Sequence, residues 1–438
     1  MSEKVVREIA LSKKEPKWML DKRLEALRVF KAKPMPKWGA DLSGLDFSSF
    51  TYFKQPEGEA KRSWADVPKK ARETFENLKI PQAERRWLSG VGAQWDSGVV
   101  YQHLKDKMEK LGVVFCDMDE AVKQYPKQVK QYFMSQCIKA EDNKFSALHG
   151  AVWSGGSFVY VPRGVKVSEP LQGFFWLNLM RGGQFEHTLI IVEEEGSLEF
   201  IEGCSAPTYQ KESLHAGVVE IFVGKKARVK YVTVQNWSRD VYNLATKRAI
   251  VQENGLMEWV SGSMGSKKTM VYPSSILTGN KAKAIHLSLS LAGKGQELDT
   301  GGKVIHIGKE TSSNIVAKSI SKDGGATSFR GLVKIVKGAK GAKSSMSCES
   351  LILDKKSQAK TYPQMEILED EVVAMHEAKT GKIAEEELFY LQSRGLSQAE
   401  AMSMIVNGFM EPVIKQLPLE YAVEMNRLIE LNMEGKVG

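Results

Sequence analysis

The chain has 438 residues, of which 42% are hydrophobic and 26% are charged, and its formal net charge is +9 at pH 7. This composition is typical of a soluble globular protein, and the length predicts two or three domains unless the architecture is elongated. The basic segment 337–343 is best interpreted as a solvated turn. No basic run is interleaved with aromatic residues, so we expect no nucleic-acid partner.

Targeting signals and disulfides are not evident. The N-terminus lacks the apolar stretch of a signal peptide, and no run of about eighteen apolar residues could span a membrane. The four cysteines, at positions 116, 137, 204 and 348, are widely and irregularly spaced, which does not indicate a disulfide framework. We therefore expect a cytoplasmic protein with reduced thiols and no membrane partner.

The first region, residues 1–149, is predicted to be mostly helical. Apolar residues recur at intervals of three to four over 16–31, 66–78, 98–111 and 124–133. Pro16 stands where a proline suits the start of a helix. Each of these four segments is predicted to form a helix.

Residues 150–381 change to short β-rich runs separated by glycine and polar turns. The runs are 157–161, 188–192, 217–223, 227–234, 285–291, 303–307, 313–321, 331–336 and 348–353. So many short strands with almost no helical period predict an all-β core. A sandwich of this size would normally split in two, whereas a solenoid lengthens freely because each coil packs against its neighbours. A β-helix is therefore favoured, although the spacing of the runs is irregular.

The helical period returns in residues 382–438. One helix is predicted over 384–393, stopped by Gly395, and a second helix follows the capping box formed by Ser397 and Glu400. A last helix is predicted over 419–433. These helices either cap the β-core or form a docking surface for a partner, and the sequence leaves both readings open.

Cysteine and histidine supply the candidate chemistry. Cys348 lies in a strand-like run and is followed by His376 and Glu377, and these are ligand types for iron or zinc. No Cys-x-x-Cys pair accompanies them, so a metal site here would be incomplete. Cys204 lies in a small-residue turn after a strand, where either a thiol open to a partner or an inert turn cysteine is expected.

The remaining motifs point away from catalysis. Cys116 and Cys137 are expected to be core residues. The sequence contains no phosphate-binding loop, no nucleophile elbow and no His-Glu-x-x-His pair. We therefore expect the chain not to be an enzyme, with any ATP hydrolysis supplied by another protein.

Several motifs together resemble one family. In matching order and nearly matching spacing, residues 202–207, 214–216, 231–237, 242–248, 304–308 and 348–378 resemble SufB, the scaffold of the SUF iron–sulfur cluster assembly system in the SufB/SufD family. The resemblance runs from about residue 147 to the C-terminus, and residues 15–24 also look like the start of a SufB chain.

The resemblance implies a right-handed parallel β-helix between helical N- and C-terminal regions. It implies pairing with SufD or with a second copy of this chain through the β-helix, and binding of a SufC-type ABC ATPase through the C-terminal helices. Sulfur would come from a desulfurase system. The cargo would be iron and a transient iron–sulfur cluster, and nothing in the sequence indicates a flavin, although one is compatible with the family.

The resemblance also implies roles for particular residues. Cys204 matches the cysteine that accepts persulfide sulfur, and the matching residues on the sulfur path are Asn178, Gln235, Trp237 and Lys247. The nascent cluster would be held by Cys348 and Glu377, with His376 either ligating or orienting a neighbour. Without the resemblance, Lys247 and Arg248 would be interpreted as an ordinary solvated pair.

Three departures from the family pattern stand out. No cysteine precedes Cys116, so an N-terminal cysteine cluster is excluded. Trp176 stands where the family commonly has arginine, and Met375 replaces a second glutamate.

Two alternatives compete with a SufB-like scaffold. A SufD-like structural partner would not accept sulfur, and the Cys204 turn and the run 235–237 argue against it. A carbohydrate-acting β-helix enzyme should carry a signal peptide and clustered acidic residues, and neither is evident.

Overall fold

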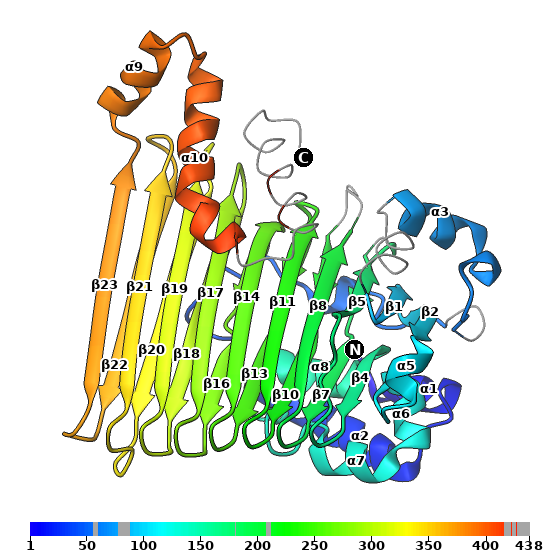
Figure 1. Ribbon diagram of the computed structural model, residues 1–438. Helices are drawn as coiled ribbons and strands as arrows, with labels where there is room; N and C mark the ends of the chain where they lie inside the picture. Colours follow the sequence, from blue (N-terminus) through cyan, green and yellow to red (C-terminus); the bar gives the residue numbers. More distant parts are fainter. Residues whose placement is uncertain are drawn as a thin grey trace.

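Parallel strands stack into a solenoid that forms most of the molecule (Figure 1). The computed structural model describes residues 1–55, 60–77, 88–179, 181–206 and 212–415, together with residues 422 and 426. The first sheet contains, in spatial order, β2 (Gly98–Leu104), β1 (Gly90–Trp95), β5 (Leu171–Trp176), β8 (Ser197–Ser205), β11 (Arg228–Trp237), β14 (Leu256–Gly265), β17 (Lys283–Ala292), β19 (Ser312–Ser321), β21 (Lys343–Ile352) and β23 (Val373–Lys382).

The second sheet faces the first, and the chain passes from one sheet to the other within each coil of the solenoid. Its long path contains β3 (Val114–Asp117), β4 (Gly156–Val161), β7 (His187–Val192), β10 (Val218–Val223), β13 (Thr246–Val251), β16 (Ser274–Leu277), β18 (Glu297–His306), β20 (Ala326–Ile335) and β22 (Gln358–Ile367). A row of short strands joins the same sheet at β18: β6 (Gly183–Gln184), β9 (Ser213–His215), β12 (Val241–Asn243) and β15 (Lys268–Val271). The earlier coils therefore have an extra corner, which later coils lack.

The core follows from the parallel register. Leu198, Val229, Met257 and Ala284 occupy the same ladder position in successive coils, and all four are buried. Each coil thus covers the apolar residues of the coil before it, which is how a solenoid buries a core without a second layer of helices.

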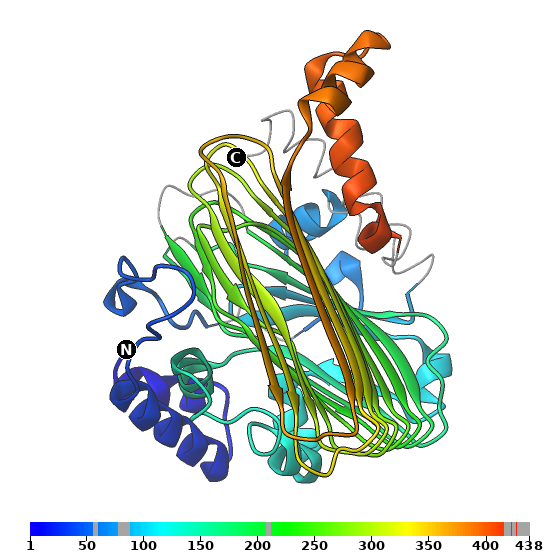
Figure 2. The ribbon, with the colours of Figure 1, turned by 90° about the vertical axis from the view of Figure 1, so that its left-hand side faces the viewer.

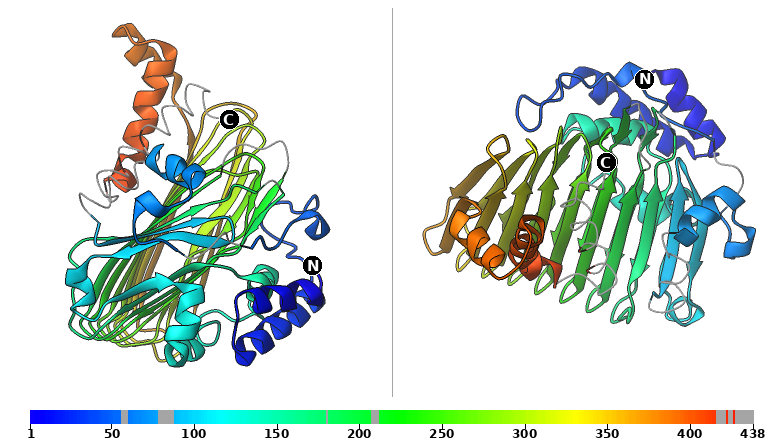
Figure 3. Two further views of the ribbon diagram at one scale, coloured as in Figure 1. Left: turned by 90° about the vertical axis from the view of Figure 1, so that its right-hand side faces the viewer. Right: turned by 90° about the horizontal axis from the view of Figure 1, so that it is seen from above.

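Helices flank the solenoid on two opposite sides (Figures 2 and 3). The N-terminal region supplies α1 (Glu3–Ser12), α2 (Lys17–Ala32), α3 (Lys69–Asn77), α5 (Asp106–Glu109), α6 (Met118–Gln124), α7 (Pro126–Tyr132) and α8 (Lys144–Val152), with short 3-10 turns η1 (Phe47–Ser49) and η2 (Trp64–Asp66). The C-terminal side has α9 (Glu385–Ser393) and α10 (Gln398–Ile414).

The helices cover both sheets, and α3 lies on the first sheet, where Ala71 and Phe75 join its apolar cluster. α1, α2 and α8 pack against the short strands, where Leu214, Tyr242 and Met270 join their apolar cluster. α10 buries Val406 and Met410 against the first sheet. None of the helices in the described residues is long and apolar enough to cross a membrane.

The predicted parallel β-helix between helical flanks is confirmed. The helices predicted over 16–31, 124–133 and 384–393 are present, as is the capping box of Ser397 and Glu400 at the start of α10. The helix predicted over 66–78 begins at Lys69 in α3. The helix predicted over 419–433 lies outside the described residues except for positions 422 and 426.

The helix predicted over 98–111 is wrong. Residues Gly98–Leu104 form β2, which pairs antiparallel with β1 through a tight turn at Asp96, whose φ is 53°. Only the short α5 follows. The β-branched pair Val99 and Val100 favours a strand, and pairing with β1 outweighs the weak helical spacing of the apolar residues. The N-terminal region therefore also supplies strands β1, β2 and β3 to the two sheets.

Candidate functional site

Cys204 lies inside the solenoid, within strand β8. It pairs in register with Phe175 of β5 and Gln235 of β11, and only 2% of its surface is exposed. The turn predicted at Cys204 is therefore wrong, because pairing on both sides extends β8 through residue 205. Burial raises the pKa of the Cys204 thiol well above its ordinary value, and the carboxylates of Glu202 and Glu186 add to this shift.

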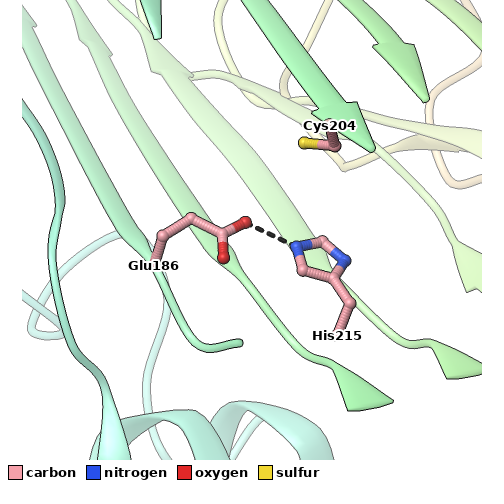
Figure 4. A group of neighbouring side chains, drawn as sticks. All are labelled: Glu186, Cys204 and His215. Carbon is pink, nitrogen blue, oxygen red and sulfur yellow. Dashed lines mark hydrogen bonds and ion pairs between the residues drawn. The ribbon is translucent and has the colours of Figure 1, made fainter. Parts of the chain in front are cut away.

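Two further residues meet Cys204 at the extra corner of the early coils (Figure 4). His215 comes from β9 and Glu186 from the bend between β6 and β7. Their ligand atoms and the Cys204 Sγ all lie within 4.8 Å of one another, and all three residues are buried. Sequence reasoning assigned no role to Glu186 or His215, because no second ligand stands at a short, recognisable spacing from either.

Hydrogen bonds hold the His215 ring in one orientation. Nε2 lies 2.5 Å from Glu186 Oε1, and Nδ1 lies 2.7 Å from Asn243 Oδ1. Asn243 Nδ2 in turn donates to Gln235 Oε1 at 2.7 Å, and the Trp237 ring lies 4.6 Å from the imidazole. Burial lowers the pKa of His215, but the Glu186 carboxylate, the hydrogen bond to Asn243 and the charge of Glu202 together raise that pKa above its ordinary value.

Lys247 also points into the interior, next to this group. Its Nζ pairs with Glu202, and the two side chains are 1% and 2% exposed. Glu202 accepts further hydrogen bonds from Tyr231 and from Thr233 Oγ1. The solvated interpretation is wrong for Lys247 and fits only Arg248, which lies on the outward face and pairs with Asp142.

A row of polar side chains leads away from Cys204 along the inner face of the first sheet. Gln235, paired with Cys204, is followed at the same ladder position by Ser263, Ser290, Ser319 and Ser350. A cavity lies at the start of this row, and the residues lining it are mostly polar: Thr233, Gln235, Lys247, Ser261, Ser263, Val271, Pro273, Ser288, Ser290, Thr300 and Gly301. Further along, Ser319 donates to Ser350 at 2.9 Å.

Cys348 lies on β21, the strand that carries Ser350 of this row. It is 2% exposed, its Sγ is 3.7 Å from Thr361 Oγ1, and burial raises its pKa. The predicted partners His376 and Glu377 lie on β23, at the edge of the sheet, and are exposed. Glu377 pairs in register with Ser347, so it projects to the opposite face from Cys348, and it forms an ion pair with Lys379 at 2.8 Å. Within this single chain, Cys348 and Glu377 are therefore not brought together.

The other predicted path residues lie at the Cys204 end. Trp237 is buried beside Cys204 in one apolar cluster. Asn178 follows β5, is partly exposed, and its backbone N–H donates to Asp96 Oδ1 at 2.6 Å. Trp176, which replaces the family arginine, pairs with Ser205 in the register next to Cys204. Cys116 and Cys137 are buried, as expected for core residues.

Comparison with known families identifies the family to which this chain belongs. The model of the SUF system FeS cluster assembly, SufBD core domain, matches residues 175–409, and that of the SufBD protein N-terminal region matches residues 88–172. The chain belongs to the SufBD family. Iron–sulfur cluster assembly SufBD family proteins of Staphylococcus saprophyticus and Staphylococcus haemolyticus are each 52% identical to it over 438 residues, covering 100% of this chain and 94% of theirs.

The family assignment covers both cysteine sites. The SufBD core match includes the coils that carry Cys204 and Cys348 as well as α9 and most of α10. The predicted resemblance is thereby confirmed at the level of the family, and this SufBD protein is a component of iron–sulfur cluster assembly.

Proposed function

We propose that this SufBD protein is an assembly scaffold that takes up sulfur on Cys204 and delivers it through the solenoid toward Cys348. The observation that carries this proposal is the row of polar side chains from Gln235, beside Cys204, to Ser350, two residues beyond Cys348. A persulfide is easily reduced or hydrolysed, and a polar route along the inner face of the sheet would limit its contact with water and with other thiols.

Sulfur uptake is a thiol exchange. The Cys204 thiolate attacks the outer sulfur of a persulfide on a desulfurase-system donor, the donor's S–S bond breaks, and the donor cysteine leaves as a thiolate. A new S–S bond on Cys204 holds the transferred sulfur, so uptake needs no outside oxidant or reductant. Release of that sulfur as sulfide for a cluster takes two electrons per sulfur from an external thiol reductant. Lys247, whose ammonium lies in the same interior, would favour the anionic forms of sulfur along the route.

Cluster formation is proposed at the far end of the solenoid. Cys348 supplies a soft thiolate and Glu377 a hard carboxylate, with His376 close by, and these ligand types suit sulfide-bound iron and incoming iron. They lie on β21 and on the exposed edge strand β23. Because one chain does not gather them, a second subunit, either SufD or another copy of this chain, would complete the site along that edge.

An ATPase partner would bind the C-terminal helices, which follow β23 in the chain. α9 buries none of its residues and exposes Phe389 and Tyr390 to 72% and 58%. α10, by contrast, uses its apolar face to pack on the first sheet. We assign α10 mainly to capping and α9 to docking of a SufC-type ATPase, which would supply the ATP hydrolysis.

The test separates uptake from assembly with single cysteine variants. The chain is produced with its ATPase partner, supplied with a cysteine desulfurase and labelled cysteine, and examined for protein-bound persulfide. Iron and a thiol reductant are then added anaerobically, and cluster absorption is measured. C204S should lose both signals, whereas C348S should retain persulfide and lose the cluster. C116S and C137S are matched controls, since each also removes one buried thiol, and they should retain both.

The same experiment distinguishes the alternative. A SufD-like structural subunit predicts that C204S supports as much persulfide and cluster as the unchanged chain. Normal cluster absorption in C348S would overturn the assignment of the assembly site.

A further inference from the structure

The corner that holds Cys204 also gathers three side chains of metal-ligating type. A thiol, an imidazole and a carboxylate from three separate segments place their donor atoms within 4.8 Å of one another. Glu186, Cys204 and His215 are 3%, 2% and 1% exposed, so solvent does not compete for these atoms. Figure 4 shows the three side chains extending into one common space.

The hydrogen bonds around His215 prepare one ring nitrogen for a metal. Asn243 Nδ2 is engaged with Gln235 Oε1, so Asn243 presents its Oδ1 to the ring, and His215 Nδ1 must carry the proton. Nε2 is left facing Glu186 and Cys204. Metal-binding histidines almost always donate their other N–H to an oxygen acceptor in this way.

Two further observations indicate space for a ligand and a buried acceptor atom without a partner. The second carboxylate oxygen of Glu186, Oε2, is buried and has no hydrogen-bond partner. A Cβ at Gly217 would lie 2.4 Å from Glu186 Oε1 and 3.0 Å from His215 Nε2, so only glycine leaves this space clear. A buried carboxylate oxygen without a partner is costly, and a bound cation would satisfy it.

We propose that Glu186, Cys204 and His215 form a mononuclear site for a divalent transition metal ion, of the ferrous or zinc type. Sulfur, nitrogen and oxygen donors of this mixture suit such ions, and three protein ligands leave a fourth position open. Binding displaces the thiol proton and the proton shared by His215 and Glu186, so a dication is exchanged for two protons. The nearby ammonium of Lys247 is already paired with Glu202.

The site goes beyond the proposed sulfur transfer and does not rest on it. A metal on Cys204 would hold that residue as a thiolate and occupy the sulfur that otherwise attacks a donor. The ion and the persulfide would therefore exclude each other at this position, which makes the metal-bound form a resting or protected state.

Cobalt titration of the full-length, chelator-treated protein tests the site directly. One equivalent of Co²⁺ under anaerobic conditions should produce visible ligand-field bands and a near-ultraviolet thiolate-to-cobalt band, both reversed by Zn²⁺. C204S should abolish the thiolate band. E186Q and H215Q should weaken Co²⁺ binding by more than about tenfold, and N243A by about tenfold to a hundredfold, the range found for groups that orient a metal ligand.

Controls keep the result interpretable. C116S and H306Q each change a buried residue of the same type outside the corner, and both should leave the cobalt spectrum unchanged. G217A tests the site without altering any ligand and should also weaken binding, so the proposal can still be judged if H215Q fails to fold.

The proposal has a clear contrary result. Absence of the thiolate band from the unchanged protein, or its persistence in C204S, would overturn the site. Because no sulfur donor is present in this titration, a negative result leaves persulfide uptake on Cys204 to its own test.

Discussion

Replacing Lys247 with methionine removes one charge of a buried ion pair and leaves the other uncompensated. Glu202 is 2% exposed and stays bonded to Tyr231 and Thr233, but neither partner carries a positive charge. Burial opposes ionisation of Glu202, yet the charge and hydrogen bond of Lys247 hold its pKa below the ordinary value. Removing one member of such a pair typically costs about 3–5 kcal/mol, so K247M should lose stability by this amount.

The neighbouring residue provides a matched control. Arg248 follows Lys247 on the same strand but pairs with Asp142 on the outer face, where both side chains are about one-quarter exposed. Exposed ion pairs contribute about 0–1 kcal/mol, so R248M should cost about 1 kcal/mol after loss of its bond to the Cys137 carbonyl is included. The two variants thus compare the same change of charge inside and outside the solenoid.

Urea unfolding followed by circular dichroism measures the difference. K247M should be less stable than R248M by at least about 2 kcal/mol, and the double variant K247M/E202Q should recover most of that loss because no buried charge remains. Equal losses in K247M and R248M would refute a stabilising role for the interior pair. Failure of E202Q to rescue would show that the loss comes from packing rather than charge.

Two further predictions concern the partner surface and pH. F389A should weaken binding of the ATPase subunit at least about tenfold in a pull-down titration, as expected for a large aromatic at an interface, whereas L11A, which removes an exposed leucine from the N-terminal side, should not. Burial raises the pKa of Glu220 to about 8, with these ionisable groups around it: Lys22, Cys137, His187 and Arg248. The folded state then holds a proton that the unfolded state releases near pH 4.5, so stability present at low pH is lost as pH rises through about 8, by up to about 1.4 kcal/mol per pH unit. Urea midpoints at pH 6.5 and 8.5 should show this decline in the unchanged chain and not in E220Q; an equal decline in both would contradict it.

The strands could be predicted because their pattern is local. Alternating apolar residues bounded by glycine mark a half-buried strand, and each predicted run from 157–161 to 348–353 overlaps an observed strand. Gly98–Leu104 was misassigned for the converse reason. Its pairing with β1 is a contact between segments, and the spacing of its own apolar residues does not report it.

The candidate site could be predicted only in part. The motifs around Cys204 and Lys247 pointed to a family and through it to functional positions, but whether a lysine points inward depends on the phase of its strand relative to the solenoid. Lys247 and Arg248 are adjacent, and only the structure assigns one to each face. Glu186 and His215 were missed because their meeting with Cys204 depends on the corner formed by β6 and β9, two very short strands.

The parallel ladder explains how one chain can carry a polar route inside an apolar core. Every coil repeats the same positions, so a hydroxyl at one ladder position lies directly above the hydroxyl of the coil before it, as in Ser290, Ser319 and Ser350. A different inward position is apolar in the earlier coils, as in Leu198, Val229 and Met257. Irregular spacing along the chain hides this order from the sequence, because turns of different length separate the coils. Register, rather than sequence distance, therefore determines which residues can act together in this protein.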